Sequence, residues 1–92
     1  MIVVTEALNE AELELTRLIL ATLNLDLDLN DIEPETALYG TGLGLDSIDI
    51  LEVALAVSQR YGVTLHADDD NNTEIFKSIR ALSNYIQRNK TK

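Results

Sequence analysis

A glycine-rich loop gives way to a helix at Gly44-Leu45-Asp46-Ser47-Ile48-Asp49, halfway along this chain. Three glycines lie between Tyr39 and Leu45, whereas the residues from Ile48 onward place apolar side chains at helical spacing. We therefore expect Ser47 at or next to a helix N-cap, where free backbone N–H groups and the helix dipole favour a phosphate ester. The glycines leave room for another protein's active site to approach the hydroxyl. This setting indicates a serine that carries a group rather than one that attacks a substrate.

The pattern after Ser47 predicts an amphipathic helix that runs to about Arg60 and ends at Gly62. Two overlapping sets of residues recur along it at the spacing of a helical face. The first set is Ile50, Val53, Ala54 and Val57, and the second is Leu51, Ala54, Leu55 and Ser58.

A first helix is predicted over residues 6–23, with its end near Asn24, and a long connection over residues 24–46. Asn9-x-x-Glu12 resembles a capping box, and Thr5 offers an alternative start. The apolar residues at helical spacing are Leu8, Leu15, Leu18, Ile19 and Leu23. Because a connection of this length is unusual in a compact domain, we expect its apolar residues to pin it over the core. These residues are Leu25, Leu27, Leu29, Ile32 and Leu38. A brief turn is also expected at residues 32–36.

The last third of the chain predicts an extended connector at residues 63–66, a short third helix at residues 73–76 and a last helix capped by Ser78. The last helix is expected to reach about Arg88, with Ile79, Leu82, Tyr85 and Ile86 facing inward. Aliphatic side chains dominate and only 4% of residues are aromatic, which favours packed helices. We therefore expect one all-α domain over residues 1–92, built as a four-helix bundle with a long first loop.

Sixteen acidic residues against seven basic ones give a net charge of −9, and this charge is unevenly spread. Residues 1–74 hold all sixteen acids and only two basic residues, a net charge of −14, whereas the last 18 residues hold five basic residues and no acid. So negative a chain argues against nucleic-acid binding and indicates partners with basic surfaces. An acidic protein without such partners would share this composition.

Several other kinds of site are disfavoured. The chain has no Cys, which excludes disulfides and thiolate chemistry and is compatible with a cytoplasmic setting. Its start lacks the basic region of a secretory signal, and no apolar run is long enough to cross a bilayer. His66 is the only histidine, and Ser47 lacks the flanking glycines of a nucleophile elbow, so a hydrolase is disfavoured. Asp26-x-Asp28-x-Asn30 fails the calcium-loop pattern at its glycine and glutamate positions, and no metal site is expected.

These features together resemble the acyl carrier protein family, the phosphopantetheine-binding domains. The resemblance covers nearly the whole chain, from the first helix and the long loop ending in Tyr39 to the last helix with Tyr85-Ile86. Between them lie Leu43-Gly44-Leu45-Asp46-Ser47-Ile48 and an amphipathic helix that ends in Tyr61-Gly62-Val63. The resemblance implies the family's bundle and a carrier without catalytic residues.

The resemblance also implies a role for particular residues. In this family the serine that matches Ser47 receives a 4′-phosphopantetheine arm from coenzyme A through a separate phosphopantetheinyl transferase, which uses Mg²⁺. The arm's thiol then carries acyl groups as thioesters. Asp46 matches the acid that the transferase recognises. The surface that docks acyl-transferring or condensing enzymes with basic patches is matched by Ile48, Asp49, Glu52 and Leu55.

We expect a monomer in the cytoplasm that neither binds nucleic acid, given its negative charge, nor inserts into a membrane, given the lack of a long apolar run. A carrier can shelter its acyl chain, and the candidate seam is Leu51, Ala54, Leu65, Phe76 and Ile79, although an ordinary core would use the same residues. The chain length and the pathway are left open by the sequence.

Three departures from the family pattern favour a carrier for specialised acyl or polyketide-type synthesis over the housekeeping carrier of fatty-acid synthesis. Ser58-Gln59-Arg60 replaces further acids, Gly42 stands where the family often has an acid, and the connection over residues 64–72 is longer. An aminoacyl or peptidyl carrier is the nearest alternative, but such domains are less acidic around the serine. A third alternative is an acidic helical adaptor that is never modified, against which the presence of both Asp46 and Ser47 argues.

Overall fold

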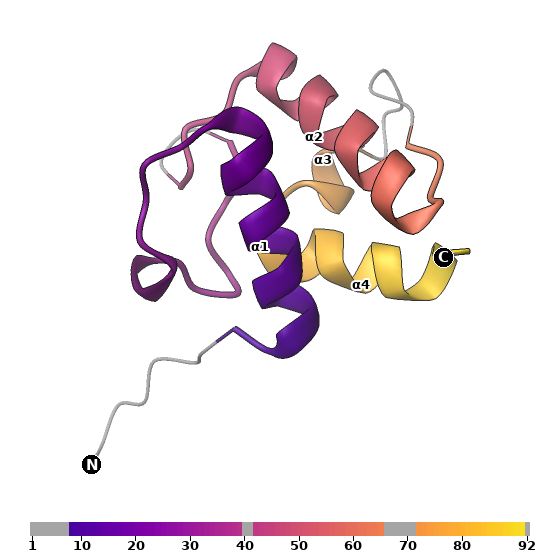
Figure 1. The fold of residues 1–92 in the computed structure, drawn as a ribbon, viewed down its shortest axis with the longest axis horizontal. Coiled ribbons are helices and arrows are strands. Elements are labelled where there is room, and N and C mark those ends of the chain that lie inside the picture. Colours follow the sequence, from indigo (N-terminus) through magenta and orange to yellow (C-terminus); the bar gives the residue numbers. More distant parts are fainter. Residues whose placement is uncertain (1–7, 40–41, 66–71, 92) are drawn as a thin grey trace.

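The computed structural model describes residues 8–39, 42–65 and 72–91 of this chain. The secondary-structure elements among these residues are all helical, as predicted. Three helices of 11 to 15 residues pack together (Figure 1): α1 (Glu10–Leu23), α2 (Ser47–Tyr61) and α4 (Ile79–Asn89). The 3-10 turn η1 (Leu29–Asp31) interrupts the first connection, and α3 (Asn72–Ile75) is only four residues long. A bundle of four full helices is therefore not confirmed, because the expected third helix is a single turn.

Helix α1 begins later than residue 6, because a capping box fixes its start. Asn9 is the N-cap; its side-chain Oδ1 accepts from the Glu12 N–H at 2.8 Å, and the Glu12 carboxylate accepts from the Asn9 N–H at 2.9 Å. Leu8 and Asn9 are not helical, and the alternative start at Thr5 lies outside the described residues. At the other end, Asn24 takes a left-handed conformation and ends the helix where predicted.

The core is formed by the inner faces of α1, α2 and α4, together with residues of the connections. The largest side chains buried in it are Phe76, Leu15, Ile19, Leu38, Ile79, Leu82 and Ile86. The first connection contributes Ile32 and Leu38 as predicted, and Leu25 packs partly against the core. Leu27 does not pin the loop, because it is 46% exposed between the exposed Asp26 and Asp28, whose hydration keeps this segment at the surface.

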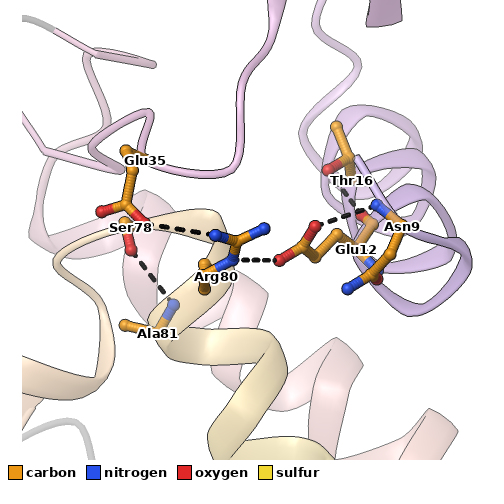
Figure 2. A network of polar contacts seen from close by, with 7 residues as sticks. All are labelled: Asn9, Glu12, Thr16, Glu35, Ser78, Arg80 and Ala81. Carbon is orange, nitrogen blue, oxygen red and sulfur yellow. Dashed lines mark hydrogen bonds and ion pairs between the residues drawn. The ribbon is translucent and has the colours of Figure 1, made fainter. Parts of the chain in front are cut away.

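A polar network joins the start of α4 to the start of α1 and to the first connection (Figure 2). The Arg80 guanidinium lies 2.9 Å from the Glu12 carboxylate, which is 1% exposed, and 4.0 Å from that of Glu35. Backbone carbonyls of the connection accept from the first N–H groups of α4, from Ile79 to Thr36 O at 3.1 Å and from Arg80 to Pro34 O at 2.8 Å. Ser78 caps α4 as predicted, since its hydroxyl accepts from the Ala81 N–H. The burial of Glu12 was not predicted, because a helical pattern alone places glutamate outside.

The C-terminal end of α2 is held from two sides. The Arg60 guanidinium pairs with the Glu14 carboxylate of α1 at 2.9 Å. After α4, the Thr91 N–H donates to Tyr61 O at 2.9 Å and its hydroxyl donates to Gly62 O at 3.0 Å. Gly62 ends the helix in a left-handed conformation, as predicted. Ser47, at the opposite end of α2, is exposed.

Candidate functional site

The candidate site is the N-terminus of α2, where the two adjacent residues Asp46 and Ser47 differ in their contacts. Asp46 is the N-cap, and its side chain accepts from the Asp49 N–H at 2.9 Å. The Asp49 carboxylate in turn accepts from the Asp46 N–H at 3.3 Å, which completes a capping box. Ser47 is therefore the first helical residue rather than the cap, and its side chain is exposed. Since Asp46 caps the helix, the Ser47 hydroxyl is not needed for this purpose.

The residues before Asp46 are anchored in the core. Leu38 is 0% exposed and Leu45 is 4% exposed, and the Leu45 N–H donates to Leu38 O at 3.0 Å. Tyr39 and Leu45 form an isolated bridge beside this bond. Gly44 has φ 71°, a conformation that side chains rarely adopt, so the chain can turn sharply between the anchored segment and the cap. The Ser47 hydroxyl is thus presented from a fixed support.

The predicted docking residues lie around this end of α2, but not all in the same state. Ile48 is 68% exposed, Leu55 is 56% exposed, and Glu52 is also exposed. Asp49 is half-buried and belongs to the capping box, so its carboxylate is turned toward the Asp46 N–H. Three of the four predicted docking side chains are therefore exposed, whereas Asp49 takes part in the capping box.

Leu51 belongs to this outward face, which the sequence analysis missed. It is 45% exposed and lies three residues after Ile48 and four before Leu55, so the three side chains form a continuous apolar stripe along α2. The inner face consists of Ile50, Val53, Ala54 and Val57, with Tyr61 at its end. Of the second apolar set in the sequence, Leu51 and Leu55 thus lie outside, whereas Ala54, which both sets share, lies inside. The spacing of Leu51 from Ile48 and Leu55 was the sequence signal that could have placed it on the outward face.

The predicted acyl-sheltering seam is corrected by the same observation. Phe76 and Ile79 are 0% exposed and Ala54 is 3% exposed, so these three side chains fill the core. Leu65 is partly buried against them, whereas Leu51 lies outside. The seam as predicted is therefore not one continuous lining.

In the second half of α2, the residues that replace the family's acids are not all free at the surface. Arg60 is tied to Glu14, so part of its positive charge is neutralised at the α1 surface. Ser58, two residues earlier in the helix, is half-buried. No cluster of three or more potential metal ligands occurs within the described parts of the chain; His66 and the three consecutive aspartates at residues 68–70 lie outside them.

Comparison with known proteins shows the family. A family model described as a phosphopantetheine attachment site matches residues 14–86, which include all of α2 and most of α1 and α4. The chain belongs to this family, and the resemblance to acyl carrier proteins is confirmed. Such domains carry covalently attached 4′-phosphopantetheine, work with phosphopantetheinyl transferases and acyl-handling enzymes, and are carriers rather than catalysts.

Two further comparisons gave no match, one with curated proteins and one with solved structures. Among the helices that the structure describes, none is long and apolar enough to span a membrane.

Proposed function

We propose that Ser47 is the residue to which 4′-phosphopantetheine is attached and that the arm carries acyl groups as thioesters. The observation that supports this most is exposure. The chain has four serines, all of them described, and only Ser47 is exposed; Ser58 is half-buried, and Ser78 and Ser83 are buried. Ser47 also lies at a helix N-terminus, where backbone N–H groups and the dipole favour the phosphate of the arm.

The residues of this site fit the attachment chemistry. The Ser47 oxygen would replace the adenosine bisphosphate portion of coenzyme A on the phosphate next to pantetheine, while the hydroxyl proton passes to a base of the transferase or to water. Asp46 keeps the helix capped before and after this exchange, and it stands beside the serine as the acid that the transferase recognises. When attached, the arm supplies a thiol, which this chain lacks because it has no Cys.

The docking surface that we propose is the exposed face of α2. Ile48, Leu55 and Glu52 are exposed on it, and Asp49 adds negative charge next to the cap. Basic patches on partner enzymes would meet the carboxylates, and shallow apolar pockets would receive the leucine and isoleucine side chains. The partners that we propose for this surface are acyl-transferring and condensing enzymes.

The pathway that we propose is fatty-acid, polyketide-type or related specialised acyl synthesis, and among these we favour a specialised pathway. Gly42 and Ser58-Gln59-Arg60 stand where acids are common in the family, which supports a dedicated set of partners. An aminoacyl or peptidyl carrier is the alternative, but Asp49 and Glu52 beside the serine favour an acyl carrier. We further propose that residues 1–92 act as one monomeric carrier domain in the cytoplasm, with α3 as the short third helix of the family's bundle.

The test is loading in vitro with coenzyme A, Mg²⁺ and a broad-specificity phosphopantetheinyl transferase, followed by intact mass measurement. The wild type should gain one arm, and Ser47→Ala should gain none. Ser58→Ala is the matched control, since it removes the other accessible hydroxyl of a serine on α2, and it should be loaded like the wild type. Loading of the Ser47→Ala variant would refute the assignment.

A further inference from the structure

We propose that Gly42 is a positioning residue for phosphopantetheine attachment, because its lack of a side chain lets the loop before α2 close against the backbone of Ala37. This inference rests on the proposed role of Ser47 and adds a residue that the sequence identified only as a departure from the family pattern. We use "Gly42 turn" for residues 37–39 and 42–45.

The first step is steric. A Cβ atom at position 42 would collide with the Ala37 carbonyl oxygen, and it would lie 2.5 Å from the carbonyl carbon and 2.7 Å from the nitrogen of Ala37. Real Cβ atoms essentially never approach other heavy atoms within 3.0 Å. All three atoms belong to the backbone, so no flexible side chain can move aside. Any residue with a Cβ atom at position 42 must therefore displace one arm of the turn.

The second step is that the same carbonyl holds the turn together. Ala37 O accepts from the Leu43 N–H at 2.8 Å, directly after Gly42 in the chain. The Gly42 N–H donates to Tyr39 O at 3.3 Å, and the Leu45 N–H donates to Leu38 O at 3.0 Å. A side chain at position 42 would therefore push against the acceptor on which the neighbouring hydrogen bond depends.

The third step connects the turn to Ser47. Both arms are fixed to the core, since Leu38 and Leu45 are buried, and only Asp46 separates Leu45 from Ser47. The turn thus determines where the N-cap begins and from where the hydroxyl is presented. A nucleophile that must meet a phosphorus atom in line is sensitive to small displacements, and an error near 1 Å can cost about 100-fold in rate.

The position should affect the chemical step more than docking. The exposed stripe of Ile48, Leu51 and Leu55 belongs to α2, whose helical hydrogen bonds do not involve the Gly42 turn. We therefore expect Gly42→Ala to lower the kcat of loading by the transferase about tenfold or more, with KM changed by less than about twofold.

A second substitution separates space from charge. Gly42→Asp supplies the acid that is common in the family together with the same Cβ atom. If the steric argument is right, Gly42→Asp should be loaded about as poorly as Gly42→Ala. Loading of Gly42→Asp at or above the wild-type rate would contradict the proposal and would indicate that charge, not space, matters at this position.

The control addresses stability. Val57 is 0% exposed on the inner face of α2 and lies ten residues after Ser47, about 15 Å along the helix. Val57→Ala should lower the melting temperature but should leave kcat unchanged at a temperature where the variant is folded. An equal fall of kcat in Val57→Ala and Gly42→Ala would show that the loss reflects general destabilisation, and the proposal would be wrong.

A measurement on the unsubstituted protein keeps the proposal testable even if Gly42→Ala does not fold. The amide protons of Leu43 and Leu45 should exchange slowly with solvent, because both are hydrogen-bonded within the turn. Rapid exchange at Leu43 would refute the proposal. Failure of the wild type to be loaded would instead refute the proposed function itself, so the two failures can be told apart.

Discussion

Two adjacent residues at the start of α2 differ in their surroundings, and the proposed attachment at Ser47 depends on this difference. Asp46 satisfies the helix N-terminus through its capping box with Asp49, and Ser47 presents its hydroxyl to solvent. Had Ser47 been the cap, attachment of an arm would have altered the oxygen that accepts the capping hydrogen bond. With the cap one residue earlier, the proposed modification of Ser47 would leave the hydrogen bonds of the capping box in place.

This division predicts different effects on stability. Asp46→Ala should lower the free energy of unfolding by about 1 kcal/mol, because a capping side chain is lost. Ser47→Ala should change it by less than about 0.5 kcal/mol, as expected for an exposed position without a special role. Urea unfolding followed by circular dichroism measures both values. A larger loss for Ser47→Ala than for Asp46→Ala would reverse the assigned roles.

Tyr61, at the other end of α2, should make stability depend on alkaline pH. Burial raises the pKa of its phenol above the usual 10.0, and the negative charge of Glu14 raises it further, against a smaller opposing effect of Arg60. The unfolded chain therefore loses this proton first as pH rises. The stabilisation is fully present below about pH 10 and is lost as pH rises through the higher pKa of the folded state.

Unfolding experiments between about pH 8 and 11 test this expectation. The wild type should lose stability more steeply with rising pH than Tyr61→Phe, which has no phenol to ionise. Tyr39→Phe, at a ring that is 40% exposed, is the control for a tyrosine at the surface. Parallel pH profiles for the wild type and Tyr61→Phe would contradict the prediction.

At the level of elements, α4 is positioned by polar contacts rather than by packing alone. The first connection supplies two carbonyl acceptors to its N-terminus, and Arg80 joins it to the buried Glu12 of α1 (Figure 2). This ion pair differs from the one between Lys77 and Glu74, whose side chains are 61% and 79% exposed. The two pairs therefore offer a comparison of buried and exposed charge within one chain.

Arg80→Ala should lower the free energy of unfolding by about 3 kcal/mol, because it leaves the Glu12 carboxylate buried without its cation. Lys77→Ala should cost less than about 1 kcal/mol, as is usual for a surface pair. Chemical denaturation of both variants gives the values directly. Equal losses would show that Glu12 finds water or another partner once the guanidinium is removed.

The outward face of α2 predicts how partners are selected. Glu52→Lys should lower kcat/KM with a basic partner enzyme about tenfold, since it removes an attraction and adds a like-charge contact. Glu33→Lys makes the same change of charge at an exposed position of the first connection and should have little effect. Glu52 is a cleaner choice than Asp49, whose replacement would also open the capping box. The measurement is steady-state acylation of the holo-protein, and equal losses in both variants would indicate a general charge effect.

For the whole molecule, the sequence predicts the helices well and their surroundings less well. The boundaries of α2 and α4, the caps at Asn9 and Ser78 and the end at Gly62 follow from local hydrogen-bonding chemistry that the sequence states directly. The burial of Glu12 and the exposure of Leu51 and Leu27 depend on how the elements pack against one another, and a helical pattern in the sequence does not contain this information. The motif around Ser47 is likewise visible in the sequence, whereas the close approach of Gly42 to the backbone of Ala37 depends on the three-dimensional path of the loop.

The central claim is that this chain carries an acyl group on an arm attached to Ser47. It is tested most directly by measuring the intact mass of the protein isolated from its own cells and then locating any added mass by fragmentation. The account predicts one 4′-phosphopantetheine, free or acylated, on the peptide that contains Ser47. An unmodified chain, or an arm on any other residue, would contradict it.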